Sequence, residues 1–240
     1  MKTNKKLFIL WFACATQMNP LLSTENHPLQ EDSSAERQHQ RNIREQYNNG
    51  LRYLHGRGVE KNEKIAFEYL KEAAESGFAH AQQNLGLCYL TGTGTEYNAK
   101  KAFKNFKLAS RTHDLAKYNL GLCYLRGEGV DKNPRKAFKL FEYVAATDYT
   151  PAQNNLALCY ADGLGVQQND GRAIYWFTNA AKQKNLNAQY NLYKMYLRED
   201  SPFYNPDFAI KWLEKAAHQG HKDAQIDLGI ATINESTETS

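Results

Sequence analysis

The sequence lacks a strong excess of charge of either sign. Its 240 residues carry 30 lysines and arginines against 26 aspartates and glutamates, which gives a formal net charge of +4 at neutral pH. A nucleic-acid-binding protein is expected to gather positive charge on one face, so this even balance argues against that class. We expect no nucleic-acid partner.

A long hydrophobic run is also missing from the N-terminal region. The apolar stretch at residues 7–13 has seven residues, whereas a membrane-spanning helix needs about 20, so we expect no stable membrane span. The stretch follows three lysines, and its last residue begins the small-residue run Ala13-Cys14-Ala15, a pattern typical of a secretory signal peptide. We expect residues 1–15 to be a signal peptide and the protein to be exported, either periplasmic or secreted. A lipoprotein anchor at Cys14 and a simple N-terminal helix are the alternatives.

Residues with catalytic or metal-binding chemistry are few and lack the spacing that such sites need. The seven histidines show no ligand spacing on one helix face; His218 and His221 are three residues apart but lie on either side of Gly220, at a predicted turn. No nucleophile with a poised base is recognisable. We therefore expect no catalytic residue, no metal site and no cofactor.

What the chain does contain is a repeated phrase. The letters NLGLCYL occupy residues 84–90 and 119–125, and a near copy, NLALCYA, occupies residues 155–161. An alanine that precedes the phrase recurs every 35 or 36 residues, at Ala81, Ala116, Ala152, Ala188 and Ala224. A second phrase, K-A-F-x-x-F-x-x-A-A, keeps the same period, with its alanine at Ala66, Ala102, Ala137, Ala173 and Ala209. Two columns with one period predict about five repeats and a terminal half repeat.

Each repeat is predicted to form two helices. Ala81, Leu85 and Tyr89 lie on one helical stripe, and the following Gly-x-Gly ends the helix, because glycine tolerates left-handed backbone. A lone helical hairpin cannot bury both of its apolar stripes, so the repeats must stack into an all-α solenoid. Gly86 and Gly121 are expected where two helix backbones come close. We assign the solenoid to residues 43–231, a disordered or partly helical spacer to residues 16–42 and a disordered tail to residues 232–240.

The unit at residues 81–110 resembles the Sel1-like repeat, a relative of the tetratricopeptide repeat with a longer glycine-rich turn. The resemblance covers residues 46–230 and is carried by these positions and their counterparts in other repeats: Ala81, Leu85, Gly86, Tyr89, Gly92, Gly94, Lys101, Ala102 and Ala109. It implies a right-handed superhelix of helix pairs that acts as an adaptor, and many bacterial members of the family are exported.

The fifth repeat departs from this pattern. Tyr193 occupies the glycine column, and a loop containing Pro202 and Pro206 replaces the Gly-x-Gly turn. This repeat is interpreted either as a drifted edge repeat or as a local bulge with a specific partner.

Three cysteines, Cys88, Cys123 and Cys159, share one column. Adjacent helices lie about 8–10 Å apart, whereas a disulfide needs Cα atoms within about 7 Å. We therefore expect free cysteines that fill small spaces in the core, with a redox or metal ladder as the alternative. Relatives with β-lactamase-like activity carry paired cysteines seven residues apart, which are missing here. The resemblance thus implies a non-enzymatic protein, with a β-lactamase-like hydrolase as the alternative.

A column of asparagines supplies the candidate binding site. An asparagine amide can pair with a peptide backbone, and in this architecture the first helix lines the concave groove. A variable column seven residues later could then set specificity through its charges. The candidate residues are Asn84, Asn119, Asn155, Asn191, Arg126, Asp162 and Arg198. The alternative is that the asparagines satisfy buried backbone groups between adjacent hairpins.

The predicted second helices carry a basic strip: Lys100, Lys101, Lys104, Lys107, Lys132, Arg135, Lys136 and Lys139. It is interpreted as a solvated outer face, with docking to an acidic surface as the alternative. Taken together, the sequence predicts a non-enzymatic protein–protein interaction scaffold with a peptide or protein partner. The competing interpretations are the hydrolase and a self-assembling structural protein.

Overall fold

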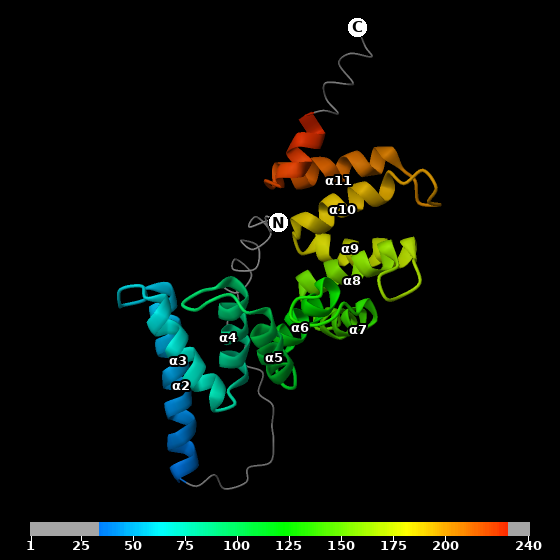
Figure 1. The fold of residues 1–240 in the computed structure, drawn as a ribbon. Helices are drawn as coiled ribbons and strands as arrows, with labels where there is room; N and C mark the ends of the chain where they lie inside the picture. Colours follow the sequence, from blue (N-terminus) through cyan, green and yellow to red (C-terminus); the bar gives the residue numbers. More distant parts are fainter. Residues whose placement is uncertain (1–33, 230–240) are drawn as a thin grey trace. The chain divides into compact units, whose positions relative to one another are not determined.

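The computed structural model describes residues 34–229, and every regular element within that range is a helix (Figure 1). The predicted all-α repeat fold is confirmed. The predicted signal peptide and the predicted tail lie outside the described residues. The chain divides into two compact units, residues 1–98 and residues 99–240, and each is described by itself.

The first unit contains α2 (Ser34–His55), α3 (Glu63–Glu75) and α4 (Ala79–Thr91). Helix α3 packs against both α2 and α4. The buried side chains of Leu54, Leu70 and Leu85 come from all three helices, one from each. Helix α2 begins at Ser34, so the last part of the predicted spacer is helical.

The second unit contains seven named helices and a final helical segment at residues 222–229. The helices are α5 (Ala99–Ala109), α6 (Asp114–Arg126), α7 (Pro134–Ala145), α8 (Thr150–Asp162), α9 (Asp170–Lys182), α10 (Leu186–Tyr196) and α11 (Pro206–His218). From α6 to α11, each helix packs against the one before it in the chain. Three of its second helices, α5, α7 and α9, each bury one large ring in this core, at Phe106, Phe141 and Phe177, whereas α11 buries Leu213.

Asparagines fix the point at which the second helix of a repeat begins. Four of them cap helices by accepting the backbone N–H three residues later: Asn62, Asn133, Asn169 and Asn205. The backbone N–H of each also donates to a tyrosine carbonyl nine residues earlier, from Asn62 to Tyr53, Asn133 to Tyr124, Asn169 to Tyr160 and Asn205 to Tyr196. These asparagines close each hairpin.

The second glycine of the Gly-x-Gly turn lies against the preceding repeat. A Cβ at Gly94 would overlap the carbonyl oxygen of Glu63, at the start of α3. In the second unit, Gly165 approaches the carbonyl of Pro134 in the same way, at the start of α7. Both glycines have positive φ. The turn therefore requires glycine for two reasons, the left-handed backbone and the lack of space.

At Gly121, the glycine column inside the first helices makes room for a ring rather than for another helix backbone. A Cβ at Gly121 would lie 2.7 Å from Cε1 of Phe141, on the second helix of the same repeat. This differs from the expected approach of two backbones. In the fifth repeat Tyr193 occupies the column, and it packs against a cluster that contains the smaller Leu213. The larger Tyr193 on α10 is thus accompanied by the smaller Leu213 on α11, whereas Gly121 on α6 is accompanied by Phe141 on α7.

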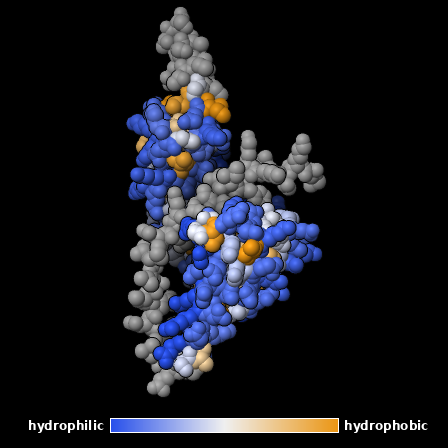
Figure 2. Space-filling model, turned by 90° about the vertical axis from the view of Figure 1, so that its left-hand side faces the viewer, coloured by the Kyte–Doolittle hydropathy of each residue, from blue (hydrophilic) through white to orange (hydrophobic). Residues whose placement is uncertain are grey.

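The described surface carries no continuous apolar band on the face shown in Figure 2, which is largely hydrophilic with separate hydrophobic residues. Within residues 34–229, no helix is both long and apolar enough to span a bilayer.

Candidate functional site

Three members of the asparagine column each join a first helix to the first helix of the preceding repeat. In the first unit, the Nδ2 of Asn84 donates to the Tyr47 hydroxyl at 3.2 Å. In the second unit, Asn155 donates to the Tyr118 hydroxyl at 2.9 Å, and Asn191 donates to Oδ1 of Asn154 at 3.2 Å. The partner is in each case a side chain 37 residues earlier. The asparagines therefore link neighbouring hairpins, but through side chains rather than through backbone groups.

The last member of the column reverses the direction of the bond. Asp227 accepts a hydrogen bond from the Tyr190 hydroxyl at 2.8 Å, again across 37 residues. Burial and the nearby Asp227 carboxylate both raise the pKa of Tyr190, because each disfavours the phenolate. Tyrosine can therefore act as acceptor toward asparagine or as donor toward aspartate at the same register.

Burial divides the four candidate asparagines. Asn119 is only 3% exposed, whereas Asn84, Asn155 and Asn191 are half-buried. Within residues 34–229, the Oδ1 atoms of these three half-buried asparagines accept no hydrogen bond. A fixed amide with an unused acceptor is suited to receive a donor from outside the chain. Asn119 is the candidate least able to do so.

The charged candidates largely engage one another. The Arg198 guanidinium lies 3.5 Å from Oδ1 of Asp162 and 3.3 Å from Oδ1 of Asp170, and it also donates to the carbonyl of Ala161 at 3.1 Å. Arg126 lies 3.8 Å from the Glu128 carboxylate in its own turn. The structure thus brings Asp162 and Arg198 together, as a link between the fourth and fifth repeats.

The cysteine column contains buried thiols. Cys88, Cys123 and Cys159 are free and at most 4% exposed, which confirms their interpretation as core side chains. Burial is the main cause that raises the pKa of each thiol to about 12, since it disfavours the thiolate. These cysteines are not activated nucleophiles. Among the described residues, no group of three His, Cys, Asp or Glu side chains could hold a metal ion.

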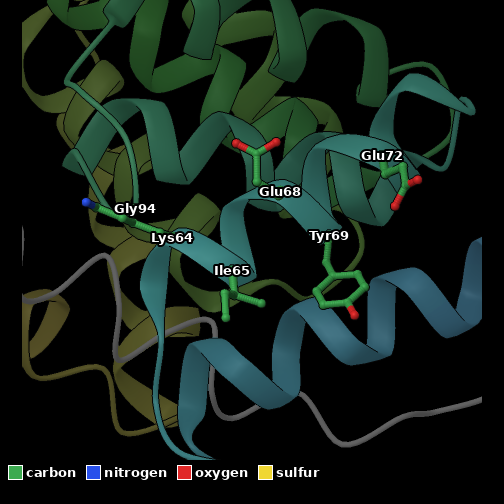
Figure 3. A pocket seen from close by; sticks show the side chains of 6 residues that line it. All are labelled: Lys64, Ile65, Glu68, Tyr69, Glu72 and Gly94. Atoms are coloured by element: carbon green, nitrogen blue, oxygen red, sulfur yellow. The ribbon is translucent and has the colours of Figure 1, made fainter.

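A surface pocket of about 380 Å³ lies along α3 in the first unit (Figure 3). Figure 3 shows Ile65 and Tyr69 on one side of α3 and Glu68 on the other, with Gly94 of the turn nearby. Lys64 and Glu72 complete the lining. None of the candidate residues from the sequence lines this pocket.

Helix pairs at a period of 35–36 residues, closed by Asn caps and linked by a recurring polar column, define an α-helical repeat protein. The Sel1 repeat matches five times, at residues 46–78, 79–111, 114–146, 150–185 and 186–221. The chain belongs to the Sel1 repeat family.

Solved structures agree with this assignment. A Sel1 repeat protein from Oxalobacter formigenes is 30% identical over 78% of this chain and 77% of its own, with a TM-score of 0.70. A Sel1 repeat protein from Klebsiella pneumoniae subsp. pneumoniae shares the fold, with 18% identity, a TM-score of 0.53, and coverage of 83% of this chain and 98% of its own. No curated relative matches this chain.

Proposed function

We propose that this chain is a non-enzymatic scaffold that binds a peptide or protein partner on the first-helix side of its repeats. Sel1 repeat proteins generally mediate protein–protein interaction, and this is the class of function to which the family points. The observation that carries the proposal is the set of half-buried asparagines whose Nδ2 is held by the preceding repeat while Oδ1 stays unused.

The inter-repeat bond prepares these side chains for binding. A free asparagine loses rotamer freedom when it contacts a ligand, which reduces affinity. In Asn155 and Asn191 that freedom is already restricted by Tyr118 and Asn154. The structural role and the binding role are therefore compatible, since one uses the donor and the other uses the acceptor of the same amide.

Affinity capture from the native source, with the full chain as bait, tests the proposal. The double variant N155A/N191A should lose partners that the unaltered chain retains. N155D/N191D keeps an acceptor at each position but not the donor, so it should retain more partner than the alanine variant. N105A is the control, because Asn105 bonds only to the backbone of its own helix. Equal capture by all variants would refute a binding role for the column. Nitrocefin hydrolysis would favour the hydrolase instead.

Export is part of the same proposal and depends on the lysine-apolar-small pattern at residues 1–15. Mass spectrometry of the protein recovered from the native source measures its N-terminus. An intact N-terminus on the mature protein would contradict cleavage.

A further inference from the structure

The loop that replaces the Gly-x-Gly turn in the fifth repeat, together with the first turn of α11, displays aromatic side chains. Phe203, Tyr204 and Phe208 are 41%, 46% and 39% exposed. The loop is anchored, because Ser201 is buried and its carbonyl accepts the backbone N–H of Tyr204. A Cβ at Gly171 would lie 3.3 Å from Cζ of Phe203, so this ring lies against the start of α9. The aromatic residues are therefore presented from a defined backbone.

The same segment carries unbalanced negative charge. Glu199, Asp200 and Asp207 are exposed beside the aromatic residues. The arginine of this segment, Arg198, already contacts two aspartates and does not offset them. We call the following set the acidic–aromatic surface: Glu199, Asp200, Phe203, Tyr204, Asp207 and Phe208. Its chemistry suits a cationic partner, which can pair with carboxylates and lie over aromatic faces.

A complementary surface exists on other helices of the second unit. Helix α5 carries four lysines and no acidic residue, and α7 carries three cations and one glutamate. The exposed members of the basic strip on these two helices include Lys100, Lys104, Lys107, Arg135, Lys136 and Lys139. Helix α5 packs against α6, and α7 packs against α6 and α8. The loop joins α10 to α11, and of these two helices α10 packs against α9. The two surfaces thus belong to separate parts of the stack.

We propose that the acidic–aromatic surface of one copy binds the basic strip of a second copy. Both halves of the charge complementarity are present on this chain, and the aromatic rings offer cation–π contacts to the lysines and arginine. This chain already uses such contacts internally: Lys194 lies 4.5 Å from the Tyr190 ring centroid, and Lys215 lies 4.8 Å from that of Trp212. Because the two patches differ, the contact is heterologous and joins copies head to tail.

Light scattering of the full chain over a range of protein concentrations tests this contact. The average mass should rise with concentration at about 0.1 M salt. It should fall toward that of the monomer at about 1 M salt, since the Debye length shrinks from about 10 Å to about 3 Å. A monomer at every concentration in low salt would overturn the proposal.

Charge exchange identifies the two surfaces. E199K/D200K and K104E/K139E should each remain monomeric alone, because each places like charges across the contact. An equimolar mixture should associate again, because the altered loop of one variant then meets the altered strip of the other. Circular dichroism establishes that both variants are folded. Association that survives both charge reversals, or a mixture that stays monomeric, would refute the assignment of these surfaces.

The aromatic contribution has its own control. F203S/Y204S should reduce association, whereas I226S removes an exposed apolar side chain from the final helical segment and should not. N155A/N191A should also leave association unchanged, because those residues lie on the first-helix side of the repeats. A failure of the partner-binding proposal and a failure of self-association are therefore distinguishable.

Discussion

The Nδ2 of Asn155 donates to the Tyr118 hydroxyl at 2.9 Å and so ties α8 to the corresponding helix one repeat earlier. The same register connects Asn84 to Tyr47 in the first unit. Side chains that recur at the repeat period thus contact their own neighbours in the stack, which is the geometry expected of nearest-neighbour repeat proteins.

This bond has a measurable contribution to stability. Replacing Asn155 by Ala, or Tyr118 by Phe, should each lower the free energy of unfolding by about 0.5–1.5 kcal/mol, the usual net value of one hydrogen bond. The double variant should cost less than the sum of the two, because the bond can be lost only once. Urea unfolding of all four proteins gives the coupling energy. Strict additivity would show that the two side chains do not interact in solution.

The turn glycines should differ in sensitivity according to their position. Gly165→Ala should lower the free energy of unfolding by about 1–3 kcal/mol, because the added Cβ meets the Pro134 carbonyl in a left-handed backbone. Gly58 has a similar φ of 72°, but no backbone atom lies within 4 Å of the place that an alanine methyl group would take, so Gly58→Ala should cost less. Thermal unfolding of the two variants compares them directly. Equal losses of stability in the two variants would show that the cost of the substitution comes from the left-handed backbone alone and not from the contact with Pro134.

The Asn caps predict a third effect. Asn169→Ala removes the acceptor for the Arg172 backbone N–H and should cost about 1 kcal/mol of stability. Asn169→Asp and Asn169→Ser retain an oxygen at the cap and should recover most of the loss. Chemical denaturation measures all three variants. A serine variant as unstable as the alanine variant would refute the cap as the cause.

The final helical segment should be pH-sensitive through His221. Its Nδ1 accepts the Ala224 backbone N–H at 3.1 Å, and its ring stacks on Tyr190 with centroids 4.6 Å apart, so the neutral ring caps the segment. Burial lowers the pKa of His221 below its usual 6.5; Lys194 also lowers it, whereas Asp223 and Asp227 raise it. The unfolded chain therefore binds the proton more readily. The cap contributes fully above pH 6.5, and its contribution is lost as the pH falls through the lower folded value.

Hydrogen exchange at Ala224 measures this loss. Protection should decrease as the pH falls below 6.5 toward the lowered folded pKa of His221, after correction for intrinsic exchange rates. H221N keeps a capping side chain that does not titrate, so its protection should depend less on pH. An identical pH profile in both proteins would exclude His221 as the responsible group.

The fold could be predicted from the sequence because the buried positions carry similar apolar residues in each repeat. Ala81, Leu85 and Tyr89 are buried on the stripe where their spacing placed them. The packing partner of Gly121 was not predicted, because the ring of Phe141 lies 20 residues away on the other helix of the hairpin. The cap column, such as Asn133 and Asn169, was visible at the same period but was not interpreted as a helix start.

The candidate site was predicted only in part. The asparagine column was recognised, but its partners vary between Tyr118 and Asn154, so no repeated letter marks them. The contact between Asp162 and Arg198 could have been predicted from the repeat period. The two residues occupy the same position in adjacent repeats, so their opposite charges lie side by side in the stack. The identity of a binding partner does not follow from the repeat period, because the partner is not part of this sequence.

The buried thiols make the protein its own probe of local opening. A thiol with a pKa of about 12 reacts with alkylating reagents only when its helix pair separates and solvent reaches the sulfur. Cys88, Cys123 and Cys159 lie in three successive repeats, so the labelling rate of each thiol reports how often its own repeat opens. The thiol that is labelled first would identify the repeat that opens most readily.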